Sequence, residues 1–294
     1  MKKPNFFIIG APKCSTTSWA AWLSQHPEIF FSTYKEPHFF NFDEPNYHFV
    51  SSLADYESLF SGANDAHKAI GEGSTFYLFS EVAVQNILSY CPSAKFIICV
   101  RNPVEMAYAL HGEMVWTGEE NVFDFKKAWE LNSERMKGLS VTKWAKAPSH
   151  LAYGESCKLG KQVQRVFDTV NSENIHVIVL DDIKKNPRDE YRKVLKFLNV
   201  SDDGFNDFTP RNTSKTLRSP MLMESMRIIG AVKNRLGIKK GFGVANSLMM
   251  HSRSGGPRKP LSDDMRIILE DHFKDDVRLL SNILGRDLMH WVRP

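Results

Sequence analysis

A lysine and a run of hydroxyl residues lie between an apolar stretch and a predicted helix near the start of this 294-residue chain. Residues 6–9 predict a buried strand, and Gly10 then opens a tight turn that contains Lys13. Four hydroxyl residues, 15–18, open the helix. The N–H groups at a helix start favour an anion, and the hydroxyls and the lysine add donors and charge. The pattern predicts a phosphate-binding loop; the alternative is a serine-capped helix start without a ligand.

The spacing of this loop differs from that of nucleotide triphosphatases. Their loop reads G-x-x-x-x-G-K-[ST], with the lysine six positions after the first glycine. Here Lys13 comes three residues after Gly10, and Cys14 follows it. A nucleotide-dependent kinase of P-loop topology stays an alternative, but the sequence shows no convincing loop of that type to hold its magnesium ion.

Alternating strands and helices must position this loop. Nearly continuous apolar runs predict buried strands at 68–71, 96–100 and 175–180, and a further short strand is expected at 29–31. Helical patterns lie between the strands, at residues 16–25, 80–89, 102–116, 121–137, 155–170 and 187–198. The alternation predicts an α/β fold, a single domain with a central, mostly parallel sheet flanked by helices, and with ligands at the carboxyl ends of its strands.

Residues 202–260 differ from the rest of the chain. Between positions 211 and 260 there are eleven Lys or Arg and one acidic residue, whereas the whole chain carries a formal net charge of only +4. Within this stretch, residues 221–240 predict a basic amphipathic helix, and a further helix is expected at 263–284. We interpret 1–294 as one domain with 202–260 as a basic lid or substrate-side insertion. A solvated basic face, a polyanion site and a peripheral membrane contact through 221–240 stay open as alternatives.

Composition limits the other functions. No apolar run reaches the roughly 18 residues of a membrane span, and the apolar run near the N-terminus is too short for a signal peptide. The sequence therefore predicts a cytoplasmic location. The four cysteines show no spacing typical of metal ligands, so neither a metal centre nor a disulfide framework is expected. The sequence does not indicate an oligomeric state.

The phosphate loop resembles the 5′-phosphosulfate loop of sulfotransferases that use 3′-phosphoadenosine 5′-phosphosulfate (PAPS). That loop usually reads G-x-x-K-x-G-T-[ST], and Gly10, Lys13, Thr16 and Thr17 match it, with Ser15 in place of the second glycine. The resemblance implies that residues 13–17, which are Lys13, Cys14, Ser15, Thr16 and Thr17, bind the cofactor. It also implies a catalytic Lys13, which would stabilise the oxygen that links sulfate to phosphate.

Residues 35–40 read Lys-Glu-Pro-His-Phe-Phe and resemble the K-E-x-H-F-F stretch of the heparan sulfate sulfotransferases and their bacterial relatives. In that group the glutamate is the proposed base, which implies that Glu36 takes the proton of the acceptor and that His38 helps to orient the acceptor. Family members usually carry Asp where this chain has Asn41. The alternatives are a surface carboxylate paired with Lys35 and a structural histidine. If Glu36 is not the base, His38 is the next candidate and His111 the one after that.

A second phosphate element resembles the same family. The strand at 96–100 ends at Arg101, and a helix capped by Asn102 begins at once. The resemblance implies that Arg101 binds the 3′-phosphate of the cofactor, although the family serine eight residues later is Ala109 here. Gly256, Arg258 and Lys259 lie where the family closes over the nucleotide and are further candidates for that phosphate.

Three shorter stretches extend the resemblance over nearly the whole chain. They are Gly71–Ser74 (G-E-x-S), Tyr153–Glu155, and the ending 285–291 (G-R-D-L-x-x-W). The resemblance implies a sulfotransferase that moves a sulfuryl group from PAPS to a hydroxyl or amine of a carbohydrate, lipid or small natural product, releasing 3′-phosphoadenosine 5′-phosphate (PAP). It implies no metal and no nucleic-acid partner. A non-catalytic polyanion-binding protein is the alternative outside the enzymes.

Overall fold

The computed structural model describes residues 2–209 and 258–292. The predicted helix at 221–240, Gly256 and most of the predicted insertion at 202–260 lie outside these described residues. Two compact units make up the chain. The first comprises the described residues of Met1–Met106, Cys157–Asn212 and Glu270–Pro294, and the second those of Ala107–Ser156 and Thr213–Leu269.

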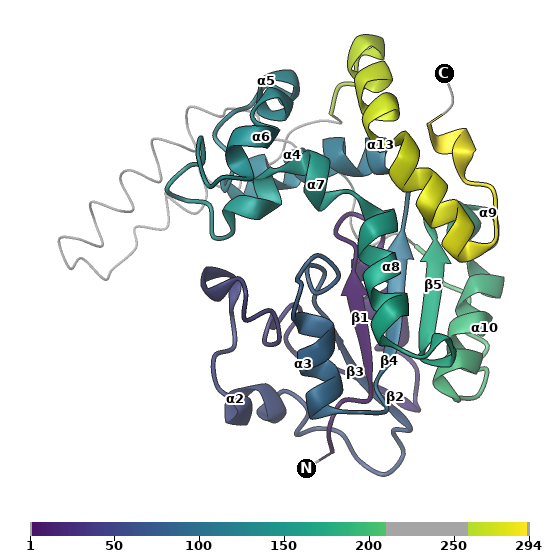
Figure 1. Cartoon of the computed structure of the whole chain (residues 1–294). Helices are drawn as coiled ribbons and strands as arrows, with labels where there is room; N and C mark the ends of the chain where they lie inside the picture. The colour runs from purple at the N-terminus through teal and green to yellow at the C-terminus, as the bar shows by residue number, and fades with distance from the viewer. Residues whose placement is uncertain (1, 210–257, 293–294) are drawn as a thin grey trace, which may run out of the picture. The chain divides into compact units, whose positions relative to one another are not determined.

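The first unit is built on five parallel strands in the order β2-β3-β1-β4-β5 (Figure 1). The predicted parallel sheet is therefore confirmed. The strand bounds are β1 Phe6–Gly10, β2 Ile29–Phe31, β3 Ala69–Gly73, β4 Lys95–Val100 and β5 Ile175–Val179. Every residue of β1 is buried, as the continuous apolar run predicts for a strand that is covered on both faces.

The strand order decides where a ligand can bind. β1 lies at the centre, and the chain leaves it first toward β2 and β3 and later toward β4 on its other side. Ligands of open α/β sheets bind beyond the carboxyl ends of the strands where the order reverses. In this sheet the carboxyl ends of β1, β3 and β4 lead into residues 10–18, Ser74 and Arg101, respectively.

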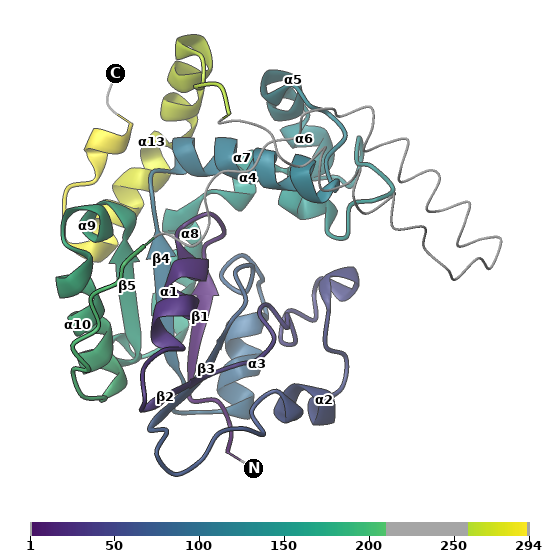
Figure 2. The same cartoon turned by 180° about the vertical axis from the view of Figure 1, so that it is seen from behind.

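Helices cover both faces of the sheet. α1 (Thr16–Leu23) packs on one face (Figure 2), and α3 (Ala83–Tyr90) and α8 (Leu159–Thr169) pack together on the other (Figure 1). The other α-helices of the described residues are α2 Leu53–Ser58, α4 Pro103–Thr117, α5 Phe125–Glu130, α6 Asn132–Arg135, α7 Tyr153–Ser156, α9 Leu180–Lys185, α10 Pro187–Leu198 and α13 Asp263–Leu284, with short 3₁₀ turns at Pro45–Tyr47, Pro148–Leu151, Ser172–Asn174 and Met289–Trp291. No helix within the described ranges is both long enough and apolar enough to cross a membrane.

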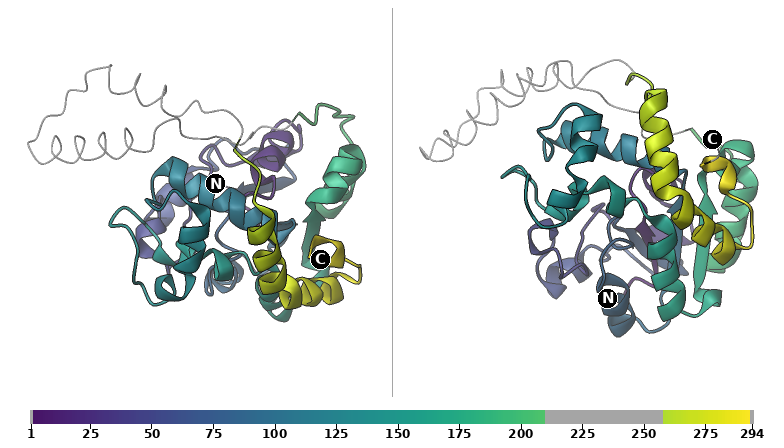
Figure 3. Two further views of the ribbon diagram at one scale, coloured as in Figure 1. Left: turned by 90° about the horizontal axis from the view of Figure 1, so that it is seen from above. Right: turned by 45° about the horizontal axis from the view of Figure 1, so that its top comes forward.

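Two predicted helices are interrupted. The predicted helix at 121–137 is in fact α5 and α6, which meet at Leu131 and begin only after Asp124 caps Lys127 N. The predicted helix at 155–170 is divided into α7 and α8 because Asp276 of α13 accepts hydrogen bonds from the first amides of α8, at 2.8 and 2.9 Å. That contact joins α13 to α8 (Figure 3). Because the two helices lie far apart in the sequence, local sequence patterns do not predict it.

The resemblance at residues 285–291 has a structural explanation. Arg286 Nη2 donates to Asp182 at 3.1 Å, and Trp291 Nε1 donates to Asp181 at 2.7 Å. Both acceptors lie in the first turn of α9, where acidic side chains also stabilise the helix dipole. This ending therefore fastens the C-terminal segment to the helix that follows β5.

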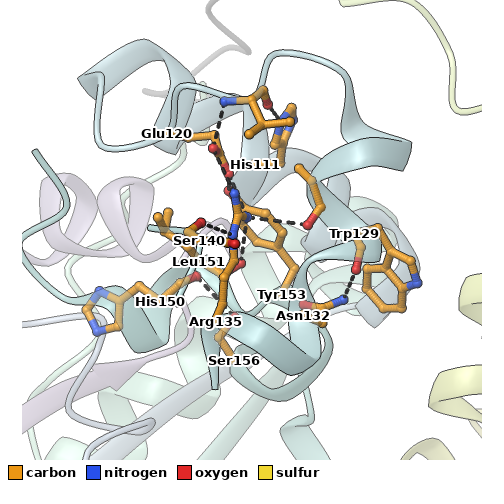
Figure 4. Close-up of polar contacts among 12 residues, drawn as sticks. His111, Glu120, Trp129, Asn132, Arg135, Ser140, His150, Leu151, Tyr153 and Ser156 are labelled. Atoms are coloured by element: carbon orange, nitrogen blue, oxygen red, sulfur yellow. Dashed lines mark hydrogen bonds and ion pairs between the residues drawn. The ribbon is translucent and has the colours of Figure 1, made fainter. Parts of the chain in front are cut away.

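A buried ion pair organises the second unit. Arg135 and Glu120 have fully buried side chains and pair at 2.7 Å, and Tyr153 donates to the same carboxylate at 2.8 Å (Figure 4). Arg135 also donates to the carbonyl of Leu151 at 3.1 Å. Because buried charges need partners on every side, this network accounts for Tyr153 of the family-like stretch as a structural residue.

Candidate active site

The phosphate loop, residues 10–18, leaves the carboxyl end of β1 under tight steric constraint. Gly10 has φ +154°, and a Cβ placed there would come within 2.7 Å of both Thr75 O and Leu78 Cβ. Only glycine allows the loop after β3 to approach so closely. The next amide, of Ala11, donates to Cys99 O of β4 at 2.8 Å. The loop is thus held between the two strands that flank β1.

The loop then turns its backbone toward the start of α1. Lys13 and Ser15 both adopt left-handed conformations, with φ 63° and 66°. α1 begins at Thr16, as predicted, but the side chain of Ser15 makes no capping hydrogen bond. The first-turn amides of a helix lack intrahelical partners, so this end presents donors to an anion. The absence of a serine cap favours the phosphate-loop interpretation over the alternative.

Cys14 contributes packing to the loop. Its side chain is fully buried, and its thiol contacts the carbonyl of Pro12 at 3.4 Å and the sulfur of Met106 at 3.9 Å. Burial raises the pKa of the thiol to about 12, although Arg101 and Lys13 act in the opposite direction. A cofactor contact of Cys14 must therefore come from its backbone and not from its thiol.

Residues from two segments of the chain hold the carboxylate of Glu36. Its Oε2 accepts hydrogen bonds from Thr75 N at 3.1 Å and Thr75 Oγ1 at 2.7 Å, and it lies 2.9 Å from His38 Nε2. Its Oε1 pairs with Lys35 Nζ at 2.7 Å. The side chain stays 26% exposed. Since Thr75 also approaches Gly10, Glu36 lies beside the loop that carries Lys13.

Opposing effects act on the pKa of Glu36. Burial raises the pKa, but the charge of Lys35 and the hydrogen bond and charge of His38 outweigh it, and the net pKa lies well below the usual range. Glu36 is therefore ionised at neutral pH. The alternative of a surface carboxylate paired with Lys35 describes only part of this environment, because Thr75 and His38 hold the other oxygen.

The side chain of His38 contacts the carboxylate of Glu36. Its ring is buried among aromatic rings, with centroids 4.7 Å from Tyr47 and 5.6 Å from Phe49. A ring so enclosed presents little surface to an acceptor, while its Nε2 reaches Glu36. This contact fits a role in orienting Glu36, and the predicted role in orienting the acceptor stays a prediction.

Arg101 contacts the phosphate loop directly. It follows β4, and its Nη1 donates to Lys13 O at 2.9 Å. Asn102 caps α4 as predicted by accepting from Val104 N at 2.9 Å, and its amide nitrogen donates to Trp291 O at 3.1 Å. Arg101 thereby ties the end of β4 to the loop after β1, and its predicted contact with the 3′-phosphate stays a prediction.

Three further sequence candidates lie in the second unit. The guanidinium of Arg258 stacks 3.5 Å from the ring centroid of Tyr108 and contacts His111 Nδ1, and Lys259 O accepts from Tyr108 at 2.8 Å. Burial and the charge of Arg258 lower the pKa of His111 to about 3. Both ring nitrogens of His111 are engaged, Nε2 with Val122 O at 2.8 Å and Nδ1 with Arg258, and such a low pKa makes the ring a poor proton acceptor, which argues against it as a fallback base. Nucleotide contacts of Arg258 and Lys259 stay predictions.

Sequence reasoning missed the side chains that hold the Glu36 segment. Thr75, Ser74, Glu72 and Tyr77 all follow or end β3, and none was assigned a role. The G-E-x-S stretch was the sequence signal that could have pointed to these residues. Across residues 2–209 and 258–292, no group of three or more His, Cys, Asp or Glu side chains is arranged to hold a metal ion.

Glu72 gives the stability of the protein an unusual pH dependence. Burial raises its pKa from 4.5 to about 7, with Glu36 adding to the increase. The folded protein then binds more protons than the unfolded chain between these values, so the free energy of unfolding should fall as pH rises through that window, by up to about 3 kcal/mol from this group. Denaturant unfolding at pH 5 and pH 8 should show this decrease in the wild type relative to Glu72→Gln. Equal pH dependence in both proteins would mean that Glu72 ionises normally.

Comparisons with known proteins agree with this geometry. The profile of the sulfotransferase domain family matches residues 3–243. Human bifunctional heparan sulfate N-deacetylase/N-sulfotransferase 2 is 24% identical over 305 residues, covering 99% of this chain and 31% of that protein. The mouse protein of the same name is 34% identical over 298 residues, covering 96% and 30%. This chain thus spans about a third of the length of these relatives.

A solved structure supports the same assignment. A sulfotransferase from Alicyclobacillus acidocaldarius superimposes with a TM-score of 0.74 and 26% identity, over 100% of both chains. The family profile spans the phosphate loop, Glu36, β3 and Arg101, and the parallel sheet brings these segments together. This chain belongs to the sulfotransferase domain family.

Proposed function

We propose that this chain transfers a sulfuryl group from PAPS to a hydroxyl or amine of an acceptor and releases PAP. The observation that carries the proposal is the meeting of three elements at the carboxyl ends of β1, β3 and β4. They are the phosphate loop with Lys13, the Glu36 carboxylate held by Thr75, and Arg101 bonded to that loop. The positive loop suits the anionic donor, and the ionised carboxylate suits the proton of the acceptor.

The reaction asks for little covalent chemistry from the protein. The acceptor oxygen or nitrogen forms a bond to sulfur while the bond from sulfur to the bridging phosphate oxygen breaks, and that oxygen leaves on PAP. Lys13 and the amides of α1 neutralise the charge that develops on the leaving oxygen. The acceptor loses one proton, which Glu36 accepts.

The two oxygens of Glu36 have different tasks in this proposal. Oε2 already receives three donors, two from Thr75 and one from His38. Oε1, which pairs with Lys35, is therefore the atom that takes the proton. A carboxylate of low pKa is a weak base, but the acceptor proton becomes strongly acidic as the bond to sulfur forms.

Transfer of radioactive sulfate from labelled PAPS tests the proposal. Carbohydrates with free hydroxyl or amine groups are the first acceptors to screen, because the relatives are named for N-sulfotransferase activity on heparan sulfate. Lipids and small natural products follow, with detection of an added SO₃ unit by mass. We expect the protein to transfer sulfate and a chelator to leave the rate unchanged. If the protein binds PAPS but transfers sulfate to no acceptor, a non-catalytic binding protein would be favoured. A cytoplasmic location and the roles of Gly256, Arg258 and Lys259 remain part of the proposal from sequence.

Arg101→Ala is expected to weaken binding of PAP by more than tenfold. The change removes a guanidinium suited to a phosphate and also the hydrogen bond that holds Lys13 O. Isothermal titration calorimetry with PAP measures the effect, and Arg192→Ala, an exposed arginine of α10 paired with Asp202, is the matched control. An unchanged affinity in Arg101→Ala would remove Arg101 from the nucleotide site.

A further inference from the structure

A buried carboxyl lies behind the Glu36 segment without a part in the proposed reaction. Glu72, on β3, is fully buried, and its Oε2 accepts a hydrogen bond from Ser74 Oγ at 2.8 Å. Tyr77 lies beside this carboxyl, and Tyr56 OH lies 3.5 Å from its Oε1. A carboxyl taken out of water at such cost usually holds something in place.

The hydroxyl of Ser74, which Glu72 binds, and the neighbouring hydroxyl of Tyr77 hold the segment 38–40. Ser74 Oγ accepts from the amide of His38 at 3.0 Å, and Tyr77 OH accepts from the amides of Phe39 and Phe40 at 2.8 and 3.3 Å. Three consecutive backbone amides are therefore held by two buried hydroxyls, and one of them, Ser74 Oγ, donates to Glu72 while the other lies beside it.

This arrangement fixes a backbone that would otherwise resist its conformation. His38 has φ +48°, a left-handed conformation that is unfavourable for a residue with a side chain. Its ring nevertheless has to reach Glu36 Oε2 at 2.9 Å. The Ser74 hydrogen bond to the His38 amide holds the residue in the geometry that this contact needs.

The direction of the hydrogen bonds explains why an acidic residue suits this position. Each hydroxyl must keep a lone pair for a backbone amide, so its own proton has to point elsewhere. Glu72 accepts the proton of the Ser74 hydroxyl, and an apolar residue would leave that buried proton without a partner.

We propose that Glu72 is a positioning residue for the Glu36–His38 pair and acts through the hydroxyl of Ser74. The proposal rests on the function proposed above, in which Glu36 takes the acceptor proton. Glu72 touches neither substrate nor cofactor. It sets the orientation of the carboxylate that does.

Glu72→Gln tests the proposal, because the amide keeps the size of the side chain and disturbs the acceptor pattern. We expect kcat to fall by roughly tenfold to 100-fold while the Kd for PAP changes less than twofold, since small displacements of a catalytic group are costly. Glu57→Gln, a carboxylate of α2 that bonds Lys3 and Tyr90 outside this network, is the matched control and should leave both values unchanged.

The decisive comparison uses the double variant Glu36→Gln/Glu72→Gln. If Glu72 acts only through Glu36, the double variant should be no slower than Glu36→Gln alone, because the group that Glu72 positions is already lost. A further tenfold loss in the double variant would identify general structural damage and overturn the proposal.

Hydrogen exchange separates this inference from the proposed reaction. In Glu72→Gln the amides of His38, Phe39 and Phe40 should exchange at least about tenfold faster, with β1 and β4 unaffected. Unchanged exchange at these amides would refute the positioning role whatever the activities are. Faster exchange together with full activity of Glu36→Gln would instead keep the positioning role and reject Glu36 as the base.

Discussion

Replacement of Glu36 by glutamine is expected to lower the turnover of sulfuryl transfer by about 10²-fold or more. The amide keeps the shape of the side chain and an acceptor for Thr75, but it cannot take a proton. Affinity for PAP should change little, because the nucleotide contacts proposed here belong to Lys13, Arg101 and the start of α1. Steady-state kinetics with the identified acceptor and calorimetry with PAP provide the two measurements.

The neighbour of Glu36 offers a variant that changes basicity without removing the carboxylate. Lys35 lowers the pKa of Glu36, so Lys35→Met should raise that pKa and move the acidic limb of the kcat profile to higher pH. Glu36→Gln should lose that limb. Near-normal turnover of Glu36→Gln on its true acceptor would show that another group takes the proton.

The fold was predictable where local signals agree with the periodicity. α10 has the predicted bounds, Pro187–Leu198, because Asn186 caps it, Pro187 begins it and Asn199 ends it in a left-handed conformation. The predicted strand at Ile29–Phe31 and the predicted helix at Asp263–Leu284 are likewise confirmed. The interruption between α7 and α8 was not predictable, since the carboxylate that causes it, Asp276, lies 116 residues from Gly160.

The residues of the candidate site also differ in how far the sequence alone predicts them. Lys13 could be selected because residue type and local spacing mark it, and Glu36 and Arg101 because the stretches around them resemble motifs of the family. Thr75 could not, because its hydrogen bonds to Glu36 span 39 residues and depend on how close β3 lies to β1. The burial of Cys14 and the role of Glu72 also depend on tertiary packing. Sequence periodicity indicates which residues are buried but not which residues they contact.

Glycine at position 10 connects the two halves of the site. It permits Thr75 O to approach the phosphate loop, and Thr75 in turn binds Glu36. The distance between the two groups that we propose to receive the leaving charge and the proton therefore depends on this close approach of the loop after β3 to the loop after β1. Such preorganisation is what sulfuryl transfer, like phosphoryl transfer, requires of a protein.

Lys13→Ala is expected to lower turnover by about 10²–10³-fold, comparable to the loss of one donor from an oxyanion hole. PAP binding should also weaken by more than tenfold, because the lysine of the loop is proposed to meet the phosphate of the leaving group. Lys13 has φ 63°, and alanine carries the same backbone strain as lysine. The loss therefore reports the ammonium group and not a relaxed loop.

Two comparisons make the Lys13 result specific. Lys13→Arg keeps the charge but replaces a compact ammonium by a planar fork, so it should recover much of the PAP affinity and little of the turnover. Lys3→Ala, which removes an exposed lysine paired with Glu57, should alter neither value. If Lys13→Ala binds PAP normally and turns over at the wild-type rate, the loop after β1 does not hold the donor, and the assignment of PAPS to this site fails with it.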